Sequence, residues 1–130
     1  YHGKLAIVSI GQRFGLIDRN GDLRVGLEYD NIVSTIRIEG LFAICRKGKW
    51  ALLNDDCKFL IDFQFDDIRD IGYEEIGRAV YNPKGLIKVK LKGKWGIINS
   101  NGVEILPCIY DERGIYHYFV KIKLYNMTSI

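Results

Sequence analysis

Three cysteines and two histidines are the side chains in this sequence best suited to nucleophilic or metal chemistry. They are Cys45, Cys57, Cys108, His2 and His117. Cys108 and His117 could form a nucleophile–base pair, but no orienting acid, glycine-rich elbow or oxyanion element lies at a recognisable spacing. No two cysteines form a Cys-x-x-Cys motif. We therefore interpret them as free thiols in a reducing, cytoplasm-like compartment, with a disulfide or a metal site as the alternative.

Carboxylates gather in the middle of the chain and could bind calcium. The set comprises Asp55, Asp56, Asp62, Asp66, Asp67, Asp70, Glu74 and Glu75. Their order lacks the Asp-x-Asn-x-Asn-Gly pattern of a calcium loop. Asp also favours turns, because its side chain bonds to nearby backbone N–H groups. We interpret the cluster as solvated turns and predict no metal and no cofactor.

A row of lysines lies on two segments that read as strands. Ile87, Val89 and Leu91 alternate with lysines, and the pattern returns in Val120-Lys121-Ile122-Lys123-Leu124. Such alternation predicts a strand with one buried and one wet face. The lysines expected on that wet face, and predicted to bind a partner, are Lys88, Lys90, Lys92, Lys121 and Lys123, with Lys94 beside them. Solubility and protection of a sheet edge are the other interpretation.

The elements that hold these side chains come from a tandem repeat. When Phe14, Trp50 and Trp95 are aligned, each is followed by a small residue, two aliphatic residues and an Asp or Asn. The alignment continues without a gap. The positions expected to be structural in all copies are Phe14, Gly15, Gly21, Tyr29, Trp50, Phe65, Trp95, Gly96, Gly102 and Tyr110.

Each copy reads as a three-stranded antiparallel meander. In the third copy the strand 87–92 is followed by Gly93, the strand 95–99, the Asn101-Gly102 turn and the strand 103–106. We expect φ > 0 at both Asn101 and Gly102, as in a two-residue hairpin turn. Cys57 stands where the other copies have Gly21 and Gly102, which predicts either local strain of roughly 1 kcal/mol or a different turn.

The small residue after each aromatic predicts close approach by another group, for which we expect an aromatic ring of an adjacent unit. One meander of this size cannot bury its apolar face alone, so the copies must share a core. The prediction is an all-β chain of meanders stacked side by side, in a solenoid-like or partial-propeller or barrel arrangement. Residues 1–130 form a single array with units at about 5–32, 41–68 and 86–112 and a partial unit at 115–125. Residues 66–79 are expected to be an extended connection.

This pattern resembles the WG-repeat family of tandem β units built around Trp-Gly with a downstream Tyr-Asp. The third copy carries the resemblance best, in Trp95-Gly96, the Asn101-Gly102 turn, Pro107 and Tyr110-Asp111. Phe14 replaces Trp in the first copy and Ala51 replaces Gly in the second. The resemblance implies no catalytic residues, and it implies a role in interaction rather than chemistry.

Composition and charge limit the range of possible functions further. The chain has 130 residues, is 48% hydrophobic and carries a net charge of +3, as expected of a globular domain. Residues 84–130 hold 8 Lys or Arg against 3 Asp or Glu, so the basic character lies in the C-terminal part. We expect a non-catalytic scaffolding module that binds a protein or a neighbouring domain of its parent chain. The alternative is a polyanion-binding module for nucleic acid or glycan. The chain starts at Tyr1, which we interpret as a processed product or a fragment of a longer protein.

Overall fold

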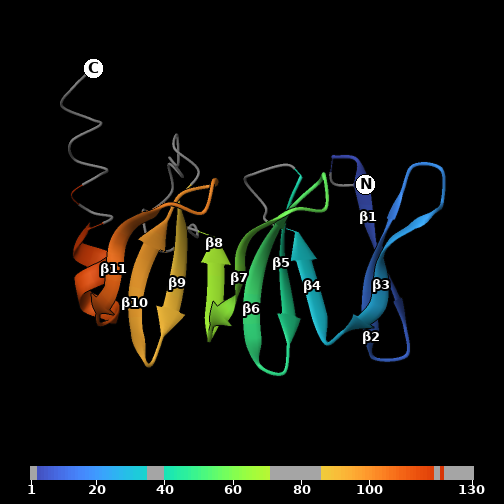
Figure 1. The fold of residues 1–130 in the computed structure, drawn as a ribbon. Helices are drawn as coiled ribbons and strands as arrows, with labels where there is room; N and C mark the ends of the chain where they lie inside the picture. Colours follow the sequence, from blue (N-terminus) through green and yellow to red (C-terminus); the bar gives the residue numbers. More distant parts are fainter. Residues whose placement is uncertain (1–2, 35–39, 71–85, 119–120, 122–130) are drawn as a thin grey trace, which may run out of the picture. The chain divides into compact units, whose positions relative to one another are not determined.

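The computed structural model describes residues 3–34, 40–70, 86–118 and 121, and in them the chain is all-β with one short helix (Figure 1). The strands form three antiparallel sheets, one for each copy of the repeat, which confirms the predicted fold class. The chain divides into two compact units, residues 1–67 and residues 68–130, and each is described by itself. No helix in the described segments is long and apolar enough to cross a membrane.

The first unit contains two sheets. The first sheet has the order β1 (Leu5–Ile10), β2 (Arg13–Asp18) and β3 (Leu23–Tyr29). The second sheet has the order β4 (Asn31–Ser34), β5 (Leu41–Arg46), β6 (Lys49–Asn54) and β7 (Phe59–Phe65). Strand β4 starts two residues after β3 ends, so the chain enters the second sheet at the Tyr29-Asp30 step.

The third sheet belongs to the second unit. Its order is β8 (Asp67–Asp70), β9 (Ile87–Leu91), β10 (Lys94–Ile98) and β11 (Glu104–Tyr110). The second and third copies are therefore four-stranded rather than three-stranded, because a short strand follows the aromatic-Asp step of the preceding copy. Residues 67–70 of the connection predicted as extended form β8, and its later residues lie outside the described part of the chain.

All three sheets have the same register, including the same irregularity. Phe14 pairs with Tyr29, Trp50 with Phe65 and Trp95 with Tyr110. In each case the register shifts on both sides of the pair formed by the first aliphatic residue of the copy, in the manner of a β-bulge. The duplication seen in the sequence is thus a duplication of backbone geometry, residue for residue.

The bulge accounts for the glycine after the aromatic in the first and third copies, whereas the second copy has Ala51 at this position. A Cβ placed on Gly96 would lie 2.6 Å from the carbonyl oxygen of Leu106, in the bulged strand of the same sheet. Gly15 meets the carbonyl of Val25 in the same way. The expected neighbour, a ring of an adjacent unit, is therefore wrong: the space is taken by backbone of the next strand.

The turns divide into two kinds. Lys47-Gly48 and Lys92-Gly93 have positive φ at both residues, as a type I′ hairpin requires. At Asn20-Gly21 and Asn101-Gly102 only the glycine is positive. The Gly102 N–H donates to the Asn99 carbonyl, and the Asn99 N–H donates to the Val103 carbonyl, so three residues form the loop. The predicted two-residue turn is corrected to a type I turn followed by a left-handed residue.

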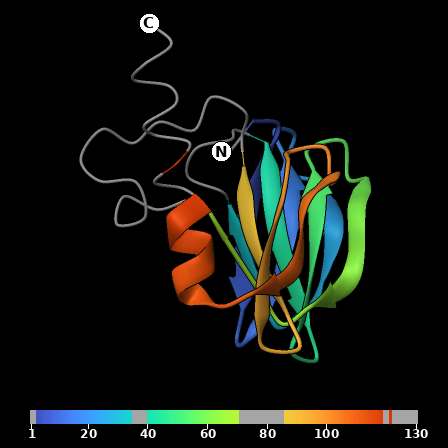
Figure 2. The same cartoon turned by 90° about the vertical axis from the view of Figure 1, so that its left-hand side faces the viewer.

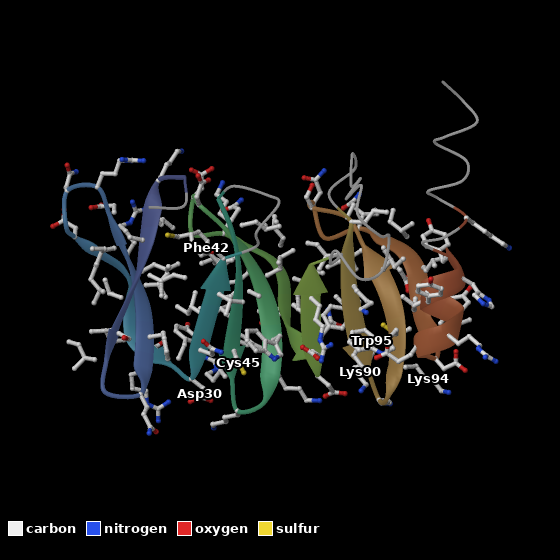
Figure 3. The ribbon with its side chains drawn as sticks, turned by 180° about the vertical axis from the view of Figure 1, so that it is seen from behind. Asp30, Phe42, Cys45, Lys90, Lys94 and Trp95 are labelled. Carbon is white, nitrogen blue, oxygen red and sulfur yellow. The ribbon has the colours of Figure 1, made fainter. Side chains whose placement is uncertain are left out.

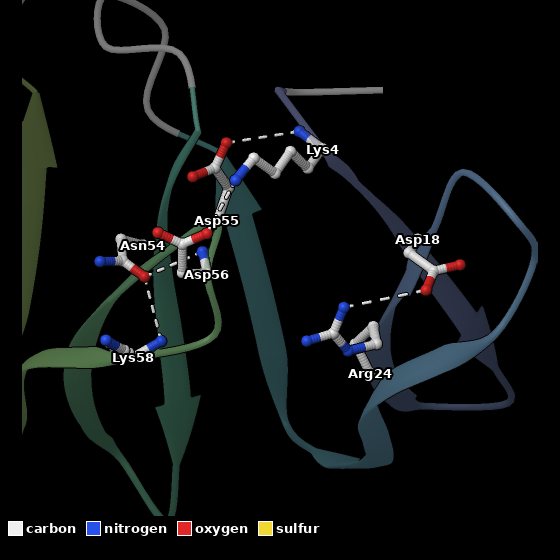
Figure 4. Close-up of polar contacts among 7 residues, drawn as sticks. All are labelled: Lys4, Asp18, Arg24, Asn54, Asp55, Asp56 and Lys58. Carbon is white, nitrogen blue, oxygen red and sulfur yellow. Dashed lines mark hydrogen bonds and ion pairs between the residues drawn. The ribbon is translucent and has the colours of Figure 1, made fainter.

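The Asp or Asn four residues after each aromatic holds this second turn. The Asn54 side-chain oxygen accepts the N–H groups of Asp56 and Lys58, both at 3.0 Å (Figure 4). Asp18 and Asn99 make the same pair of bonds in the other copies. Cys57 has a φ of 62°, so the strain predicted from the alignment is confirmed as a left-handed non-glycine residue.

The first two sheets share one core. Leu5, Leu16 and Tyr29 of the first sheet pack with Ile32, Phe42 and Ile44 of the second, and Phe42 is completely buried. Phe14 is half-buried beside this core. Within the first unit the copies complete each other's interior, as the sequence predicted.

In the second unit a helix over residues 112–118 covers one face of the third sheet (Figure 2). Its Ile115 is 1% exposed and packs with Trp95 and Ile97. The helix starts at Asp111, whose carboxylate accepts the Gly114 N–H at 2.8 Å. The repeat predicted a strand near 120–124, but Lys121 is helical, and residues 120 and 122–124 lie outside the described segments.

Candidate functional site

The lysine row does not form the shared wet face that the alternation predicted. Lys90 pairs with Trp95 and Lys88 pairs with Ile97 across the β9–β10 ladder, so these lysines share the face of the aromatic residue. Lys88 is only 3% exposed and Lys90 is half-buried. The alternation failed because both faces of β9 are covered: Ile87 and Val89, on the opposite face, are also buried.

The remaining lysines of the row lie elsewhere. Lys92 is exposed in the β9–β10 turn, and Lys94 is exposed at the start of β10. Lys121 is exposed and helical, and Lys123 lies outside the described residues. Among the lysines of the row that the structure describes, Lys88 and Lys90 are brought together, over the ring of Trp95.

Three cations surround the indole of Trp95. The Lys88 ammonium lies 4.7 Å from the ring centroid, the Lys90 ammonium 5.3 Å and the Arg69 guanidinium carbon 5.5 Å. Each distance is within the range of a cation–π interaction. Lys90 and Trp95 lie near the β9–β10 turn (Figure 3). We refer to Arg69, Lys88, Lys90 and Trp95 together as the Trp95 cation cluster.

A carboxylate from the helix reaches this cluster. Glu112 lies 3.9 Å from the Lys88 ammonium, and its side chain is 70% exposed while that of Lys88 is 4% exposed. Glu112 follows the N-cap residue Asp111, where a negative charge also suits the helix dipole. The buried ammonium thus has an exposed carboxylate at its outer end.

The cluster is specific to the third copy. The shared register places Lys88 at the position of Ile7 and Ala43, and Lys90 at the position of Ser9 and Cys45. Arg69 of β8 stands where β4 has Val33. The first two copies have neutral side chains at these positions, so only the third copy carries charge at them.

Exposed apolar side chains in β11 and in the residue before it are the second feature that distinguishes the third copy. Val103, Ile105 and Ile109 are 56%, 42% and 64% exposed, with Pro107 exposed between them. The corresponding positions are Asp22, Arg24, Gly26 and Glu28 in the first copy and Lys58, Leu60, Asp62 and Gln64 in the second. We refer to Val103, Ile105, Pro107 and Ile109 as the β11 apolar row.

The thiols of Cys45 and Cys108 do not have the lowered pKa of an activated nucleophile. Burial raises the pKa of Cys45 and of Cys108, which keeps both protonated at neutral pH. The Cys108 Sγ lies 3.8 Å from the Val89 carbonyl oxygen, and His117 is exposed with its ring 6.3 Å from that of Tyr116. All three cysteines are free.

The acidic cluster forms ion pairs instead of a metal site in the part that the structure describes. Lys4 donates from its ammonium to Asp56 at 2.8 Å and from its backbone N–H to Asp55 at 3.4 Å (Figure 4). Among the described residues no three His, Cys, Asp or Glu side chains gather closely enough to hold a metal ion.

The Asp of each aromatic-Asp step has a structural role, although sequence reasoning treated it only as a repeat marker. Asp30 accepts the backbone N–H of Lys47 at 2.7 Å and the Arg13 guanidinium at 2.6 Å, and so holds the turn of the next sheet (Figure 3). Asp66 pairs with Lys49, and Asp111 caps the helix. The recurrence of this Asp in all three copies was the signal that could have revealed its role.

Comparison with known proteins agrees with the geometry. The model of the family described as "WG containing repeat" matches residues 14–50 and 95–119. These segments include the aromatic residue of all three copies. No curated protein and no solved structure matches the chain.

Proposed function

The chain carries WG-containing repeats in several copies, and from this premise we propose that it is a non-catalytic interaction module whose third sheet binds a protein partner or a neighbouring domain. The single observation that supports the proposal is the β11 apolar row. Exposed large apolar side chains in a row are unusual on a soluble surface and typical of interaction sites.

The internal copies act as controls for this interpretation. The same repeat positions carry the polar residues Asp22, Arg24 and Glu28 in the first copy. The first and second copies each expose one large apolar side chain in this strand, Leu23 at 52% and Phe59 at 47%. The third copy instead exposes three, Val103, Ile105 and Ile109, each by more than a third.

The edge of β11 is unsuited to pairing with a further strand. Pro107 lies within it and has no N–H to donate, and proline protects edge strands in this way. We therefore assign the contact to the side chains of the row, which would lie against an apolar surface of the partner.

Affinity capture with matched variants tests the proposal. The variant Ile105→Arg/Ile109→Glu gives the third copy the residues of the first, while Leu23→Gln replaces an exposed apolar residue of β3 as the control. We expect the wild-type protein and the control to retain the same partner and the double variant to lose it. Titration of that purified partner should show at least about tenfold weaker binding to the double variant. An identical set of retained proteins for all three would contradict the proposal.

The polyanion-binding alternative is supported by the excess of Lys and Arg in residues 84–130. It predicts that affinity for a single-stranded oligonucleotide falls steeply between ~50 and ~200 mM salt. An affinity that does not change with salt over this range would exclude the polyanion-binding alternative.

A further inference from the structure

The first strand of the first sheet differs from its counterparts in its pairing. Among the described strands only β2 pairs with β1, whereas β5 also pairs with β4, and β9 also pairs with β8 (Figure 1). In the second and third sheets this additional strand follows the aromatic-Asp step of the preceding copy. We refer to an aromatic-Asp step together with its short strand, residues 29–34 or 65–70, as an exit segment.

One face of the first sheet is also less covered than the corresponding face of the other two. Three apolar side chains of each copy share this face, because two are alternate residues of one strand and the third is paired across the ladder. They are Ala6, Val8 and Ile17 in the first copy, Phe42, Ile44 and Leu53 in the second, and Ile87, Val89 and Ile98 in the third. Those of the second and third copies are at most 3% exposed, whereas those of the first are half-buried.

Strand β1 has none of the side chains that protect a sheet edge from pairing. Its six residues, Leu-Ala-Ile-Val-Ser-Ile, include neither a charge nor a proline, and Ile10 at its end is 72% exposed. By contrast, β11 contains Pro107, and β7 contains Asp62. An edge strand of this composition is suited to receive a further strand, with backbone bonds for affinity and side-chain contacts for specificity.

We propose that the outer edge of β1 binds the exit segment of a further copy of the WG repeat, a strand of the pattern aromatic-Asp-x-Ile. The second sheet defines the register, because Ile32 of its exit segment pairs with Ile44. Val8 stands at the position of Ile44, so the isoleucine of the incoming segment lies beside Val8 and covers the half-buried face. The site goes beyond the proposed partner surface, since it shares no residue with the β11 apolar row.

The β1–β2 turn already has the conformation that holds the Asp of an exit segment. In the second copy Asp30 accepts the N–H of Lys47 at 2.7 Å, and Lys47 has a φ of 53°. Gly11 stands at the position of Lys47 and has a φ of 61°. The Gly11 N–H is therefore placed to donate to the aspartate of the incoming segment.

The described part of this chain has no exit segment to spare for a second molecule. Residues 29–34 and 65–70 contribute β4 and β8 to their own sheets. After Tyr110-Asp111 the third copy has Arg113 where the other two have Ile32 and Ile68, and residues 112–118 are helical. The occupant is therefore a further copy of the repeat rather than a second molecule of this chain in its observed fold.

A grafted strand tests the proposal in the full chain. Residues 1–4 are replaced by a copy of residues 29–40, so that an exit segment precedes Leu5 as it precedes Leu41, with the same number of linking residues. We expect the β1 amides that point to the outer edge to exchange their hydrogens at least about tenfold more slowly than in the parent chain. Nuclear Overhauser contacts should join the grafted isoleucine to Val8.

Two matched grafts show whether the pattern matters. A graft with lysine at the position copied from Ile32 has the same length, but it places a charge on the apolar face, and it should lose the protection. A graft with alanine at the position copied from Asp30 lacks the acceptor for the Gly11 N–H and should retain only part of it. Circular dichroism of each grafted chain reports whether it is folded.

Three results would overturn the proposal. These are unchanged exchange at the outer edge of β1 in a folded grafted chain, equal protection by the isoleucine and lysine grafts, and self-association of the parent chain that Val8→Lys abolishes in sedimentation equilibrium. The last result would make a second molecule of this chain the occupant. Since the β11 apolar row is unchanged in all these chains, partner capture by that row remains a separate test of the proposed function.

Discussion

At the scale of single residues, one backbone position distinguishes the second copy from its neighbours. Cys57 adopts a φ of 62°, where the other copies have Gly21 at 84° and Gly102 at 82°. A side chain in this conformation is unfavourable by about 1–2 kcal/mol, because Cβ approaches the following carbonyl. The alignment of the copies was sufficient to predict this, since a shared turn imposes its backbone on every copy.

The variant Cys57→Gly should therefore raise the free energy of unfolding by about 1 kcal/mol. Urea denaturation followed by fluorescence measures the change. Cys57→Ala is the control, because it removes the sulfur and retains the strain, and it should bring no comparable gain. A lower denaturation midpoint for the glycine variant would show that the register of the second copy is wrong.

Gly96→Ala should destabilise the protein by about 1–3 kcal/mol, since the new methyl group would press on the Leu106 carbonyl. In an ordinary strand the same change is mildly favourable. Gly26→Ala in β3 provides the comparison, because its added Cβ would meet nothing closer than 3.8 Å. Thermal unfolding of both variants compares the two losses of stability. Equal losses would contradict the bulge as the reason for glycine at position 96.

The buried thiol of Cys45 and the half-buried thiol of Cys108 predict a loss of stability at alkaline pH. Burial raises the pKa of Cys45 and Cys108 above the ordinary value of 9.0, so the unfolded chain loses these protons first. Stability is then complete below pH 9.0 and decreases as the pH rises from there towards the folded-state pKa values. Urea denaturation from pH 7 to about 10 measures the decrease, and it should be smaller in Cys45→Ala/Cys108→Ala. An identical pH dependence in that variant would contradict this prediction.

At the scale of elements, the sequence predicted the strands that carry the repeat and missed those that carry its connections. Strands β4 and β8 have four residues each, too few for an alternating pattern to be distinguished from a turn. Ile32 and Ile68 stand at the same repeat position and are buried, and this recurrence was the available signal. The third copy has Arg113 there, and a helix replaces the strand.

The helix depends on its cap. Asp111→Ala removes the acceptor of the Gly114 N–H and should destabilise the helix by about 1 kcal/mol. Fraying of the helix would expose Trp95, so acrylamide should quench its fluorescence more strongly in a Trp50→Phe background. Arg113→Ala leaves the cap intact and is the control. Unchanged quenching after loss of Asp111 would mean that the helix does not depend on this residue.

The burial of Lys88 also belongs to this scale. The alternation of apolar residues and lysines along β9 correctly predicted a strand, but such a pattern shows only which residues share a face. Which of the two faces is wet depends on the covering elements, here a helix from the end of the chain. That tertiary contact has no counterpart in the local pattern, so the site around Trp95 could not be predicted from the sequence.

At the scale of the whole molecule, shared cores make the first two copies depend on each other. Phe42 is fully buried between the first and second sheets. Phe42→Ala should destabilise the first unit by about 3–5 kcal/mol, whereas Phe59→Ala, at a position 47% exposed, should have a much smaller effect. Urea denaturation of the two variants measures the difference, and similar midpoints would contradict a core shared by the copies.

The division into residues 1–67 and residues 68–130 falls between β7 and the end of β8. The sequence predicted one continuous array over all 130 residues, and this remains a prediction. At this scale the sequence correctly located the repeat, because the aromatic, turn and aromatic-Asp positions of each copy recur at fixed distances.

The central claim is that one β unit occurs three times in the same register, bulge included. Nuclear Overhauser contacts between backbone protons test it directly at the pairs Phe14–Tyr29, Trp50–Phe65 and Trp95–Tyr110. The structure predicts a cross-strand contact at all three pairs, each followed by the same shift at the next aliphatic pair. A contact displaced by one residue in any copy, or missing from one of them, would contradict the claim.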